Sequence, residues 1–345
     1  MKVKIDVPPI FIFLTKRILY SIFVLFGVIT IVFIVTRVAL PNPAVAWAGG
    51  RVTESFLRTI EERYHLNEPV YTQFYYYLQD LLSGNWGEVP QTGEPVLENI
   101  RRFLPATIEL TLFAVLIMIA IGIPLGVIAA VNKDKTIDHT SRIVALLGVS
   151  SPPFLFALLL QLIFFYHLGL IPESGGRISS NLGMPTYITG LIIFDGLIVG
   201  DWEALTSALQ HIILPAFSLA FLNLGLISRL TRSSMLEALA SDYVRTAKAK
   251  GLSKNKVIYK HALRNSLIQP ITVLNVYIAY FLGGSLVVET IFSWPGMGRY
   301  AANSIVLVDL PSIMGITIVF TIAVIITNLI ADIIYAILDP RLRKG

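Results

Sequence analysis

The carboxylates and histidines best placed to do chemistry lie at the ends of long apolar stretches of this 345-residue chain. They are His167, His211, Glu109, Glu289 and Asp332, and none of them lies in the middle of a stretch. A charge at the bilayer centre costs at least about 2.5 kcal/mol, so proton- or sodium-coupled carriers keep such groups only along the ion path. We therefore expect these side chains to be interfacial or snorkelling groups.

Sequence patterns for catalysis are absent. The chain has no Walker A pattern, HExxH, GxSxG or GxGxxG, so neither nucleotide hydrolysis nor hydrolase chemistry is indicated. It has no cysteine, which excludes disulfides, thiolate zinc sites and iron–sulfur clusters. No Cys, Met or His cluster favours a metal, and no nucleic-acid partner is expected. The sequence predicts a protein that is not an enzyme, binds no cofactor itself and carries no energy source of its own.

The composition is that of a membrane protein. Apolar residues make up 55% of the chain and charged residues 14%, against about 45 to 50% and about 25% in globular proteins. A spanning helix needs about 20 mostly apolar residues. Six stretches without Asp, Glu, Lys or Arg reach that length: 18–36, 110–132, 143–172, 204–228, 265–288 and 310–331. A further segment, 182–200, is interrupted by Gly and Pro, and we interpret it as an external loop.

The distribution of basic residues sets the orientation. With the N-terminus inside, 19 of the 27 Lys and Arg residues are cytoplasmic, including nine in 229–264, as the positive-inside rule requires. The sequence thus predicts an all-α, multi-pass protein of the cell membrane, surrounded by lipid, with six transmembrane helices and cytoplasmic N- and C-termini. Residues 1–36 hold the cytoplasmic N-terminus and first span, 37–109 a structured external segment, and 110–345 a five-helix core with the cytoplasmic loop 229–264.

The external segment is expected to contain two helices. Apolar residues at helical spacing indicate one over 53–63. A second should begin near Pro69 and end at Ser83 and Gly84. Its aromatic residues, Phe74 and the tyrosines at 71 and 75–77, favour anchoring at the membrane surface over a role in substrate binding.

The basic cytoplasmic loop has internal order. Ser241 or Asp242 can cap a short helix that runs to Ala249, and Gly251 can end it in a left-handed turn. Ser253 can then cap a second helix leading into the fifth span. Two short capped helices joined by a glycine predict a stiff element below the membrane.

One face of the first helix suggests a partner. Tyr243, Val244 and Ala247 are expected to form an apolar ridge beside a basic face, a pattern typical of a helix laid into a groove. The plainer interpretation of the basic residues is a solvated loop or a contact with anionic lipid headgroups.

Several sequence strings resemble one family. DYVRTAKAKGL at 242–252, followed by HALRN at 261–265, resembles the signature cytoplasmic loop of permease subunits in ATP-binding-cassette importers. The most similar branch handles peptides, nickel and, in some thermophiles, oligosaccharides. VVETIFSWPGMGRY at 287–300 is similar to that branch's loop between the last two spans, and 328–343 is similar to its C-terminus. The order of these strings extends the resemblance over essentially the whole chain.

The resemblance implies a type I importer transmembrane fold, in which this chain and a second homologous permease form a heterodimeric pore. Two ATP-binding subunits, which hold ATP and Mg²⁺, would dock below, and an extracellular or periplasmic binding protein would deliver the ligand. The implied ATPase-coupling residues are Asp242, Tyr243, Val244, Arg245, Thr246, Ala247, Lys248, Ala249, Lys250 and Gly251. Peptide, oligosaccharide and nickel all stay open as substrates.

Four amide side chains in or near the spans are candidate pore-lining residues. Asn223, Gln269, Asn275 and Asn328 either line the path or form hydrogen bonds between helices. Other classes are disfavoured. An ATP-independent secondary carrier should have carboxylates at the midplane, a passive channel needs no docking loop, and an intramembrane enzyme needs a catalytic dyad within a span.

Overall fold

The fold is known from a computed structural model that describes residues 9–40, 42–48, 53–171 and 175–338. Within these ranges the regular elements are helices, and no β-strand occurs apart from one isolated bridge between Glu88 and Pro95. The all-α prediction is therefore confirmed for the described residues. The tails expected at the two cytoplasmic ends lie partly outside them, before residue 9 and after residue 338.

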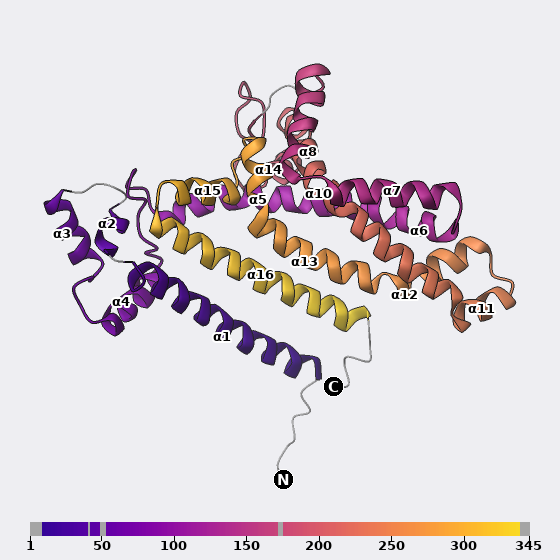
Figure 1. Cartoon of the computed structure of the whole chain (residues 1–345), viewed down its shortest axis with the longest axis horizontal. Coiled ribbons are helices and arrows are strands. Elements are labelled where there is room, and N and C mark those ends of the chain that lie inside the picture. The colour runs from indigo at the N-terminus through magenta and orange to yellow at the C-terminus, as the bar shows by residue number, and fades with distance from the viewer. Residues whose placement is uncertain (1–8, 41, 49–52, 172–174, 339–345) are drawn as a thin grey trace, which may run out of the picture. The chain divides into compact units, whose positions relative to one another are not determined.

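The chain divides into two compact units, Met1–Pro105 with Gly296–Gly345 (unit 1) and Ala106–Pro295 (unit 2). In unit 1, the long helix α1 lies alongside α16 (Figure 1). The helices of this unit are α1 (Pro9–Arg37), α2 (Pro43–Trp47), α3 (Glu54–Arg63), α4 (Val70–Ser83), the first part of α5 (Val96–Ile117), α15 (Met297–Val306) and α16 (Leu310–Leu338).

The two helices predicted for the external segment are confirmed as α3 and α4. Helix α4 ends at Gly84, whose φ of +86° is the left-handed value that glycine adopts at low cost. Its aromatic side chains divide: Phe74 and Tyr77 pack against Phe33 of α1, with ring centroids 5.0 and 5.7 Å away. Tyr71, in contrast, is 77% exposed.

Arg37 joins α1 to the segment that contains α2, α3 and α4. Its guanidinium carbon lies 4.4 Å from the ring centre of Trp47, and its Nη1 donates a hydrogen bond of 2.6 Å to the carbonyl of Tyr64. Nearby, Arg63 binds both carboxylate oxygens of Glu88, at 2.8 and 2.6 Å. The hydrogen bond from Arg63 holds the pKa of Glu88 below its usual value. These contacts hold together the described part of residues 37–88.

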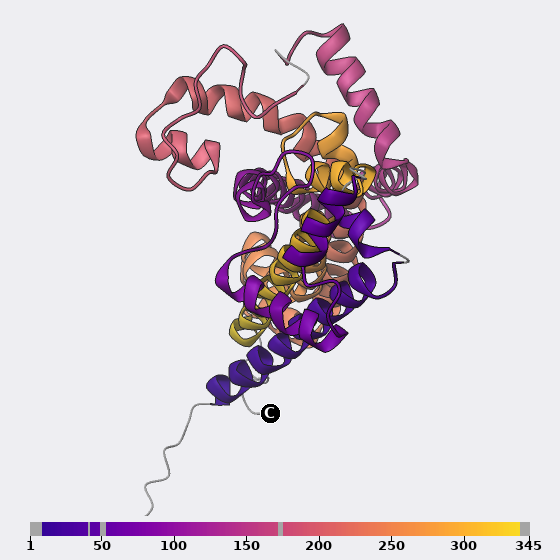
Figure 2. The same ribbon diagram turned by 90° about the vertical axis from the view of Figure 1, so that its left-hand side faces the viewer.

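Unit 2 is organised around α10, which packs along α6 and α7. Figure 2 shows α9 beside the first turns of α10. The elements of this unit, after the second part of α5, are η1 (Met118–Gly122), α6 (Ile123–Val131), α7 (Thr136–Ser150), α8 (Pro153–Leu160), η2 (Gln161–His167), α9 (Ile192–Val199), α10 (Trp202–Ala240), α11 (Asp242–Ala249), η3 (Lys256–Leu263), α12 (Arg264–Ser266), α13 (Ile268–Gly284) and α14 (Leu286–Ile291), where η marks a π-helix.

Glycines let these helices approach closely. A Cβ placed on Gly126 would lie 2.5 Å from the Cβ of Thr231, and one on Gly225 would lie 2.5 Å from the carbonyl oxygen of Ala145. Real Cβ contacts are not this short, so α6 and α7 each meet α10 backbone to backbone.

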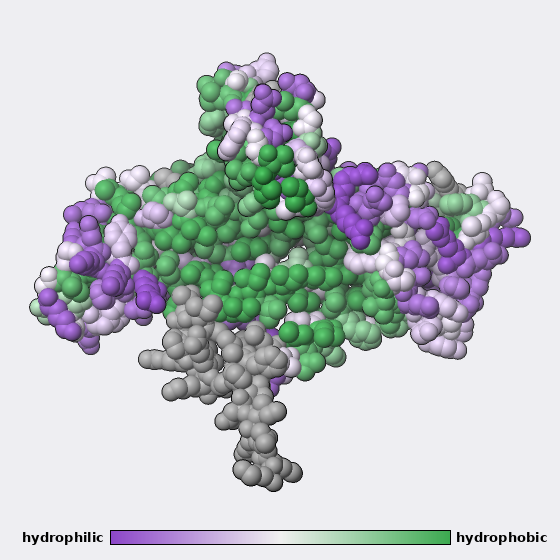
Figure 3. Space-filling model, turned by 180° about the vertical axis from the view of Figure 1, so that it is seen from behind, coloured by the Kyte–Doolittle hydropathy of each residue, from purple (hydrophilic) through white to green (hydrophobic). Residues whose placement is uncertain are grey.

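Within the described residues, four helices are long and apolar enough to cross a membrane: Thr15–Arg37, Val96–Val131, Trp202–Ala240 and Leu310–Ile334. Two bent helix pairs reach the same standard, Thr136–Gly148 with Pro153–His167 and Lys256–Ser266 with Ile268–Gly283. Four to six spans are therefore supported. In Figure 3 the long helices show hydrophobic side chains, while hydrophilic ones gather around α11 in unit 2 and around α3 and α4 in unit 1.

Helix ends differ from the predicted span ends. Helix α10 continues 12 residues past position 228 to Ala240, and α7 begins at Thr136 rather than at residue 143. Arginine is a good helix former, so a helix need not stop where its apolar run stops. Residues 143–150 of the predicted third span are separated from the rest at Ser151, because Pro152 and Pro153 disfavour a continuous helix there.

Candidate functional site

The predicted cytoplasmic helix is present as α11 and forms the middle of an elbow, which we define as residues 241–253. Ser241 has extended backbone angles between α10 and α11, as a capping residue should. Its hydroxyl, however, donates to the carbonyl of Ala238 in α10 rather than capping α11. At the other end Gly251 has φ +72°, and its N–H donates to the carbonyl of Lys248 over 3.0 Å. The left-handed turn is thus where the sequence predicts it.

The inner face of α11 is fixed to its own chain. Val244 is fully buried and Ala247 is 5% exposed, and both belong to one apolar cluster with Met235 of α10 and Val257 of η3. Burying a valine side chain contributes about 1.5 to 3 kcal/mol. The prediction that Val244 and Ala247 form a ridge for a partner is therefore wrong, because this chain already covers them.

The outer face of α11 is polar and basic. Its exposed residues are Asp242, Tyr243, Arg245, Thr246, Lys248, Ala249 and Lys250. The ion pair between Arg245 and Asp242 spans 3.5 Å on an open surface, so it contributes little. The acidic residue in the first turn and Lys248 in the last turn match the helix dipole. This arrangement is suited to docking, because a rigid inner face holds an exposed, charged outer face in a fixed orientation.

A buried ion pair joins α7 to α10, the helix that precedes the elbow. Asp138 of α7 is fully buried and accepts hydrogen bonds from Nε and Nη2 of Arg232 in α10, at 2.6 and 2.7 Å. The backbone N–H of Asp134 donates to the same carboxylate over 3.0 Å. Because Asp138 and Arg232 are 94 positions apart, no local sequence pattern predicts this ion pair. It fastens α7 to the part of α10 that leads into the elbow.

The expectation that Glu109 and Glu289 are interfacial is wrong. Glu109 is 1% exposed and accepts 2.6 Å and 2.8 Å hydrogen bonds from Arg177 and from the N–H of Ile193. Glu289 is fully buried and accepts hydrogen bonds of 2.7 Å from the hydroxyls of Thr107 and Ser285. Both carboxylates are structural groups of unit 2, since buried charges persist only with such partners.

His211 is also buried rather than interfacial. It is 4% exposed, and its Nδ1 lies 2.8 Å from the carbonyl oxygen of Ser207 one turn earlier in α10. His167 is exposed, as predicted for a group at a membrane surface. Asp332 forms a 3.0 Å ion pair with Nε of Arg17.

A loop of the segment 182–200 is organised by one carboxylate that the sequence did not single out. Asp195 of α9 accepts hydrogen bonds from the N–H groups of Ile188, Thr189 and Gly190 and from the Thr189 hydroxyl, at 2.6 to 3.3 Å. Burial alone would raise the pKa of Asp195, but these hydrogen bonds together lower it below its usual value. The sequence signal for this turn was Thr189 and Gly190 followed five residues later by Asp195, because Asp side chains commonly accept hydrogen bonds from nearby backbone N–H groups in turns.

The four candidate pore-lining residues lie on three helices: Asn223 in α10, Gln269 and Asn275 in α13, and Asn328 in α16. Asn223 donates to the carbonyl of Leu219 in its own helix, and Gln269 accepts a 2.7 Å hydrogen bond from Ser234 of α10. That second bond matches the helix-to-helix alternative. Asn275 is half-buried in α13. A role in lining a pore therefore stays a prediction for these side chains.

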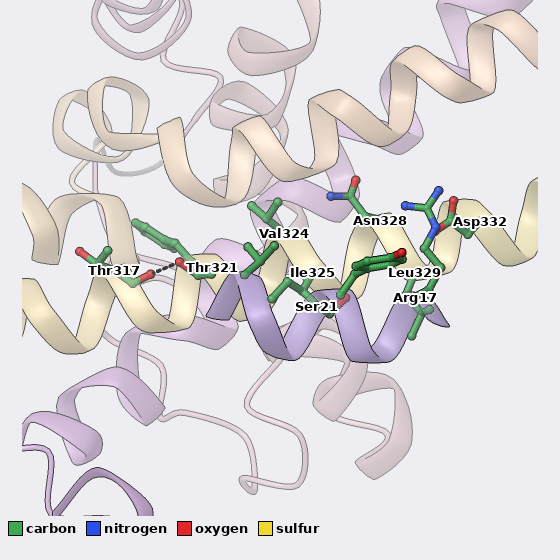
Figure 4. A pocket seen from close by; sticks show the side chains of 12 residues that line it. Arg17, Ser21, Thr317, Thr321, Val324, Ile325, Asn328, Leu329 and Asp332 are labelled. Carbon is green, nitrogen blue, oxygen red and sulfur yellow. Dashed lines mark hydrogen bonds and ion pairs between the residues drawn. The ribbon is translucent and has the colours of Figure 1, made fainter. Parts of the chain in front are cut away.

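Asn328 lines a cavity of about 460 Å³ between α1 and α16 in unit 1 (Figure 4). The walls are mostly apolar, with Val324 and Ile325 beside it, and the ion pair of Arg17 with Asp332 lies at one end. No group of three or more His, Asp or Glu side chains suited to a metal occurs in the described part of the chain.

These features define a polytopic helical membrane protein with a stiff basic elbow. Residues 122–344 match the family described as binding-protein-dependent transport system inner membrane component, and residues 10–111 match the N-terminal region of such components. The chain belongs to this family. It is therefore a multi-pass inner-membrane permease of a transport system, and the family is one of transport proteins rather than enzymes.

Curated relatives agree along the whole length. The chain is 42% identical over 324 residues to the probable D,D-dipeptide transport system permease protein DdpB of Escherichia coli K12, covering 94% of this chain and 95% of the relative. It is 41% identical over 329 residues to the dipeptide permease DppB of Alkalihalophilus pseudofirmus, covering 95% and 98%. The oligopeptide permease AppB of Bacillus subtilis is 36% identical over 331 residues, covering 96% and 98%.

Proposed function

We propose that this chain is one half of the translocation pore of an ATP-driven peptide importer. The observation that carries the proposal is its similarity, over at least 94% of its length, to relatives named as dipeptide and oligopeptide permeases. The lack of a metal-ligand cluster in the described residues gives nickel no support, and no feature of those residues favours oligosaccharide. A di- or oligopeptide is therefore the substrate class we propose.

The proposed topology has six spans with both termini in the cytoplasm. The four long helices and the two bent pairs supply six candidate crossings. This count keeps the basic segment 229–264 and its elbow on the cytoplasmic side, which the positive-inside rule favours.

The proposed partners supply the parts of an importer that this chain lacks. A second homologous permease completes the pore, two ATP-binding subunits hold ATP and Mg²⁺, and an external binding protein delivers the peptide. This chain binds no cofactor. The coupling residues are Asp242 to Gly251, and within them the exposed side chains of α11 meet the ATP-binding subunits, while Val244 and Ala247 keep the helix rigid from within.

Reconstitution tests this function. The importer, assembled from this chain and its proposed partners, is placed in liposomes with the binding protein and Mg-ATP, and uptake of a labelled dipeptide is measured beside a labelled trisaccharide. We expect dipeptide uptake that requires ATP and every subunit. Uptake that persists without ATP, or uptake of the trisaccharide alone, would contradict the proposal.

A further inference from the structure

Besides the cavity of unit 1, the structure contains a cavity of about 400 Å³ in unit 2, between α7 and α10. Its charged lining consists of three arginines, Arg142 from α7 and Arg229 and Arg232 from α10, and two serines, Ser141 and Ser228, lie among them. No carboxylate of the described residues lines this cavity. Three guanidinium groups around one cavity form a donor set for a phosphate group, which arginine binds through paired hydrogen bonds.

The two carboxylates nearby do not neutralise all three guanidinium charges. Asp138 binds Arg232 through two hydrogen bonds, and the negative charge of Asp134 acts on the same arginine. Arg142 lies at 3.8 Å from Asp138, a long ion pair, and also 2.9 Å from His139. Arg229 is exposed and forms no hydrogen bond or ion pair with any described residue. Arg142 and Arg229 therefore have donors to spare for a ligand.

The surface beside the arginines is apolar. Leu146 lines the cavity and is 67% exposed, and Ile143 and Leu147 of the same helix are each 60% exposed. In a membrane protein, an exposed strip of apolar side chains on a helix can contact the acyl chains of lipids. A small soluble anion would use the arginines and leave the strip empty, whereas a phospholipid would use both.

We propose that this cavity binds the phosphate of an anionic phospholipid of the cytoplasmic leaflet, with an acyl chain along Ile143, Leu146 and Leu147. Basic pockets between membrane helices on the cytoplasmic side suit anionic headgroups. The choice of leaflet rests on the proposed topology, but the binding itself does not rest on peptide transport. Failure of the transport assay would leave this test intact.

Binding is measured with the delipidated full-length chain in a neutral detergent, titrated with a fluorescent phosphatidylglycerol. Each arginine near such a lipid contributes about 1 kcal/mol, so Arg229→Gln and Arg142→Gln should each weaken binding about fivefold, and the double variant about thirtyfold. Arg229→Lys, which keeps the charge, should recover most of the affinity.

Lys133→Gln is the matched control, because Lys133 is an exposed base in the loop before α7 that does not line the cavity. Its affinity should equal that of the unchanged chain. Equal weakening in Lys133→Gln and Arg229→Gln would overturn the proposal in favour of diffuse surface charge. Displacement of the lipid by inorganic phosphate at a concentration equal to that of the lipid would overturn it in favour of a simple anion site.

A second measurement does not depend on variants. Phosphatidylglycerol with a diazirine in its acyl chain is photocrosslinked to the unchanged chain, alone and in the assembled importer, and the labelled peptides are identified by mass spectrometry. We expect labels on 143–147 in both samples. Labels elsewhere, or their loss when the second permease is present, would overturn the proposal.

Discussion

Replacing Gly251 with valine tests whether the shape of the elbow couples the permease to its motor. Gly251 has φ +72°, and a Cβ built there meets no heavy atom within 4 Å. The cost of the substitution is therefore backbone strain alone, about 1 to 2 kcal/mol for a side chain in the left-handed region. That cost lowers the ratio of the native turn to other conformations by about 5- to 30-fold.

The expected result is a loss of coupling with an intact fold. The hydrogen bonds from the N–H groups of Gly251 and Leu252 to the end of α11 depend on this turn, so the orientation of α11 becomes variable. In reconstituted importer, peptide uptake per ATP hydrolysed should fall several-fold, while expression and membrane insertion stay normal. Gly251→Asn should retain most coupling, because asparagine tolerates the left-handed region.

Gly84→Val is the matched control. Gly84 has φ +86°, and a Cβ added to it also meets no heavy atom within 4 Å, but this glycine ends α4 in unit 1, outside the elbow. The same strain there should leave uptake per ATP unchanged. Unchanged transport by Gly251→Val, or equal loss of coupling with asparagine and with valine at this position, would show that the left-handed turn does not set the coupling.

Three further predictions concern the fold. Gly126→Ala should destabilise the chain by about 1 to 3 kcal/mol in thermal unfolding, because its Cβ would meet Thr231 at 2.5 Å. Arg232→Met removes both short hydrogen bonds from the side chain that neutralises the buried Asp138, leaves Arg142 at 3.8 Å as its nearest cation, and should cost about 3 to 5 kcal/mol. Adding Asp138→Asn should recover more than about 1 kcal/mol of that loss in a double-mutant cycle. The pKa of Asp195 is lowered in the folded chain, so its stabilisation is present above the unfolded value of about 3.9 and is lost as the pH falls through the lowered value, in unfolding measured against pH.

Each of these has its own check. Gly283→Ala adds a methyl group in α13 where no heavy atom lies within 4 Å, so it should not lower the stability of the chain. An equal loss of stability in Gly126→Ala and Gly283→Ala would show that the close packing of α6 is not the cause. Additive costs at Asp138 and Arg232 would show that the pair is not coupled. Asp195→Asn should remove the acid-dependent loss, and a variant that keeps the full loss would assign it to another carboxylate.

Local signals predicted much of the fold. The helix stops at Gly84 and Gly251 were predictable because a left-handed turn has a strong preference for glycine. The spacing of apolar residues located α3, and the capping residue at 241 or 242 located the start of α11. Gly122 and Gly126 form a GxxxG pattern, which is typical of close helix packing, and both meet residues of α10 in the structure.

Long-range pairing was not predictable from one sequence. The partners Glu109 and Arg177 are 68 positions apart, and Thr107 and Glu289 are 182 apart, so their burial depends on how the helices assemble. The sequence showed only that these carboxylates end apolar runs, which suited an interfacial position equally well. The direction of Val244 was misjudged for the same reason, since apolar character alone does not say which surface covers a side chain.

The most direct test of the coupling proposal uses the absence of cysteine from this chain. Lys248→Cys places a single thiol on the exposed face of α11, and a short bifunctional thiol reagent is applied to the assembled importer with cysteines introduced on the surface of the ATP-binding subunits. We expect a crosslink between this chain and an ATP-binding subunit, and labelling of the thiol only from the cytoplasmic side. A thiol that is labelled from outside, or that crosslinks only to the external binding protein, would contradict it.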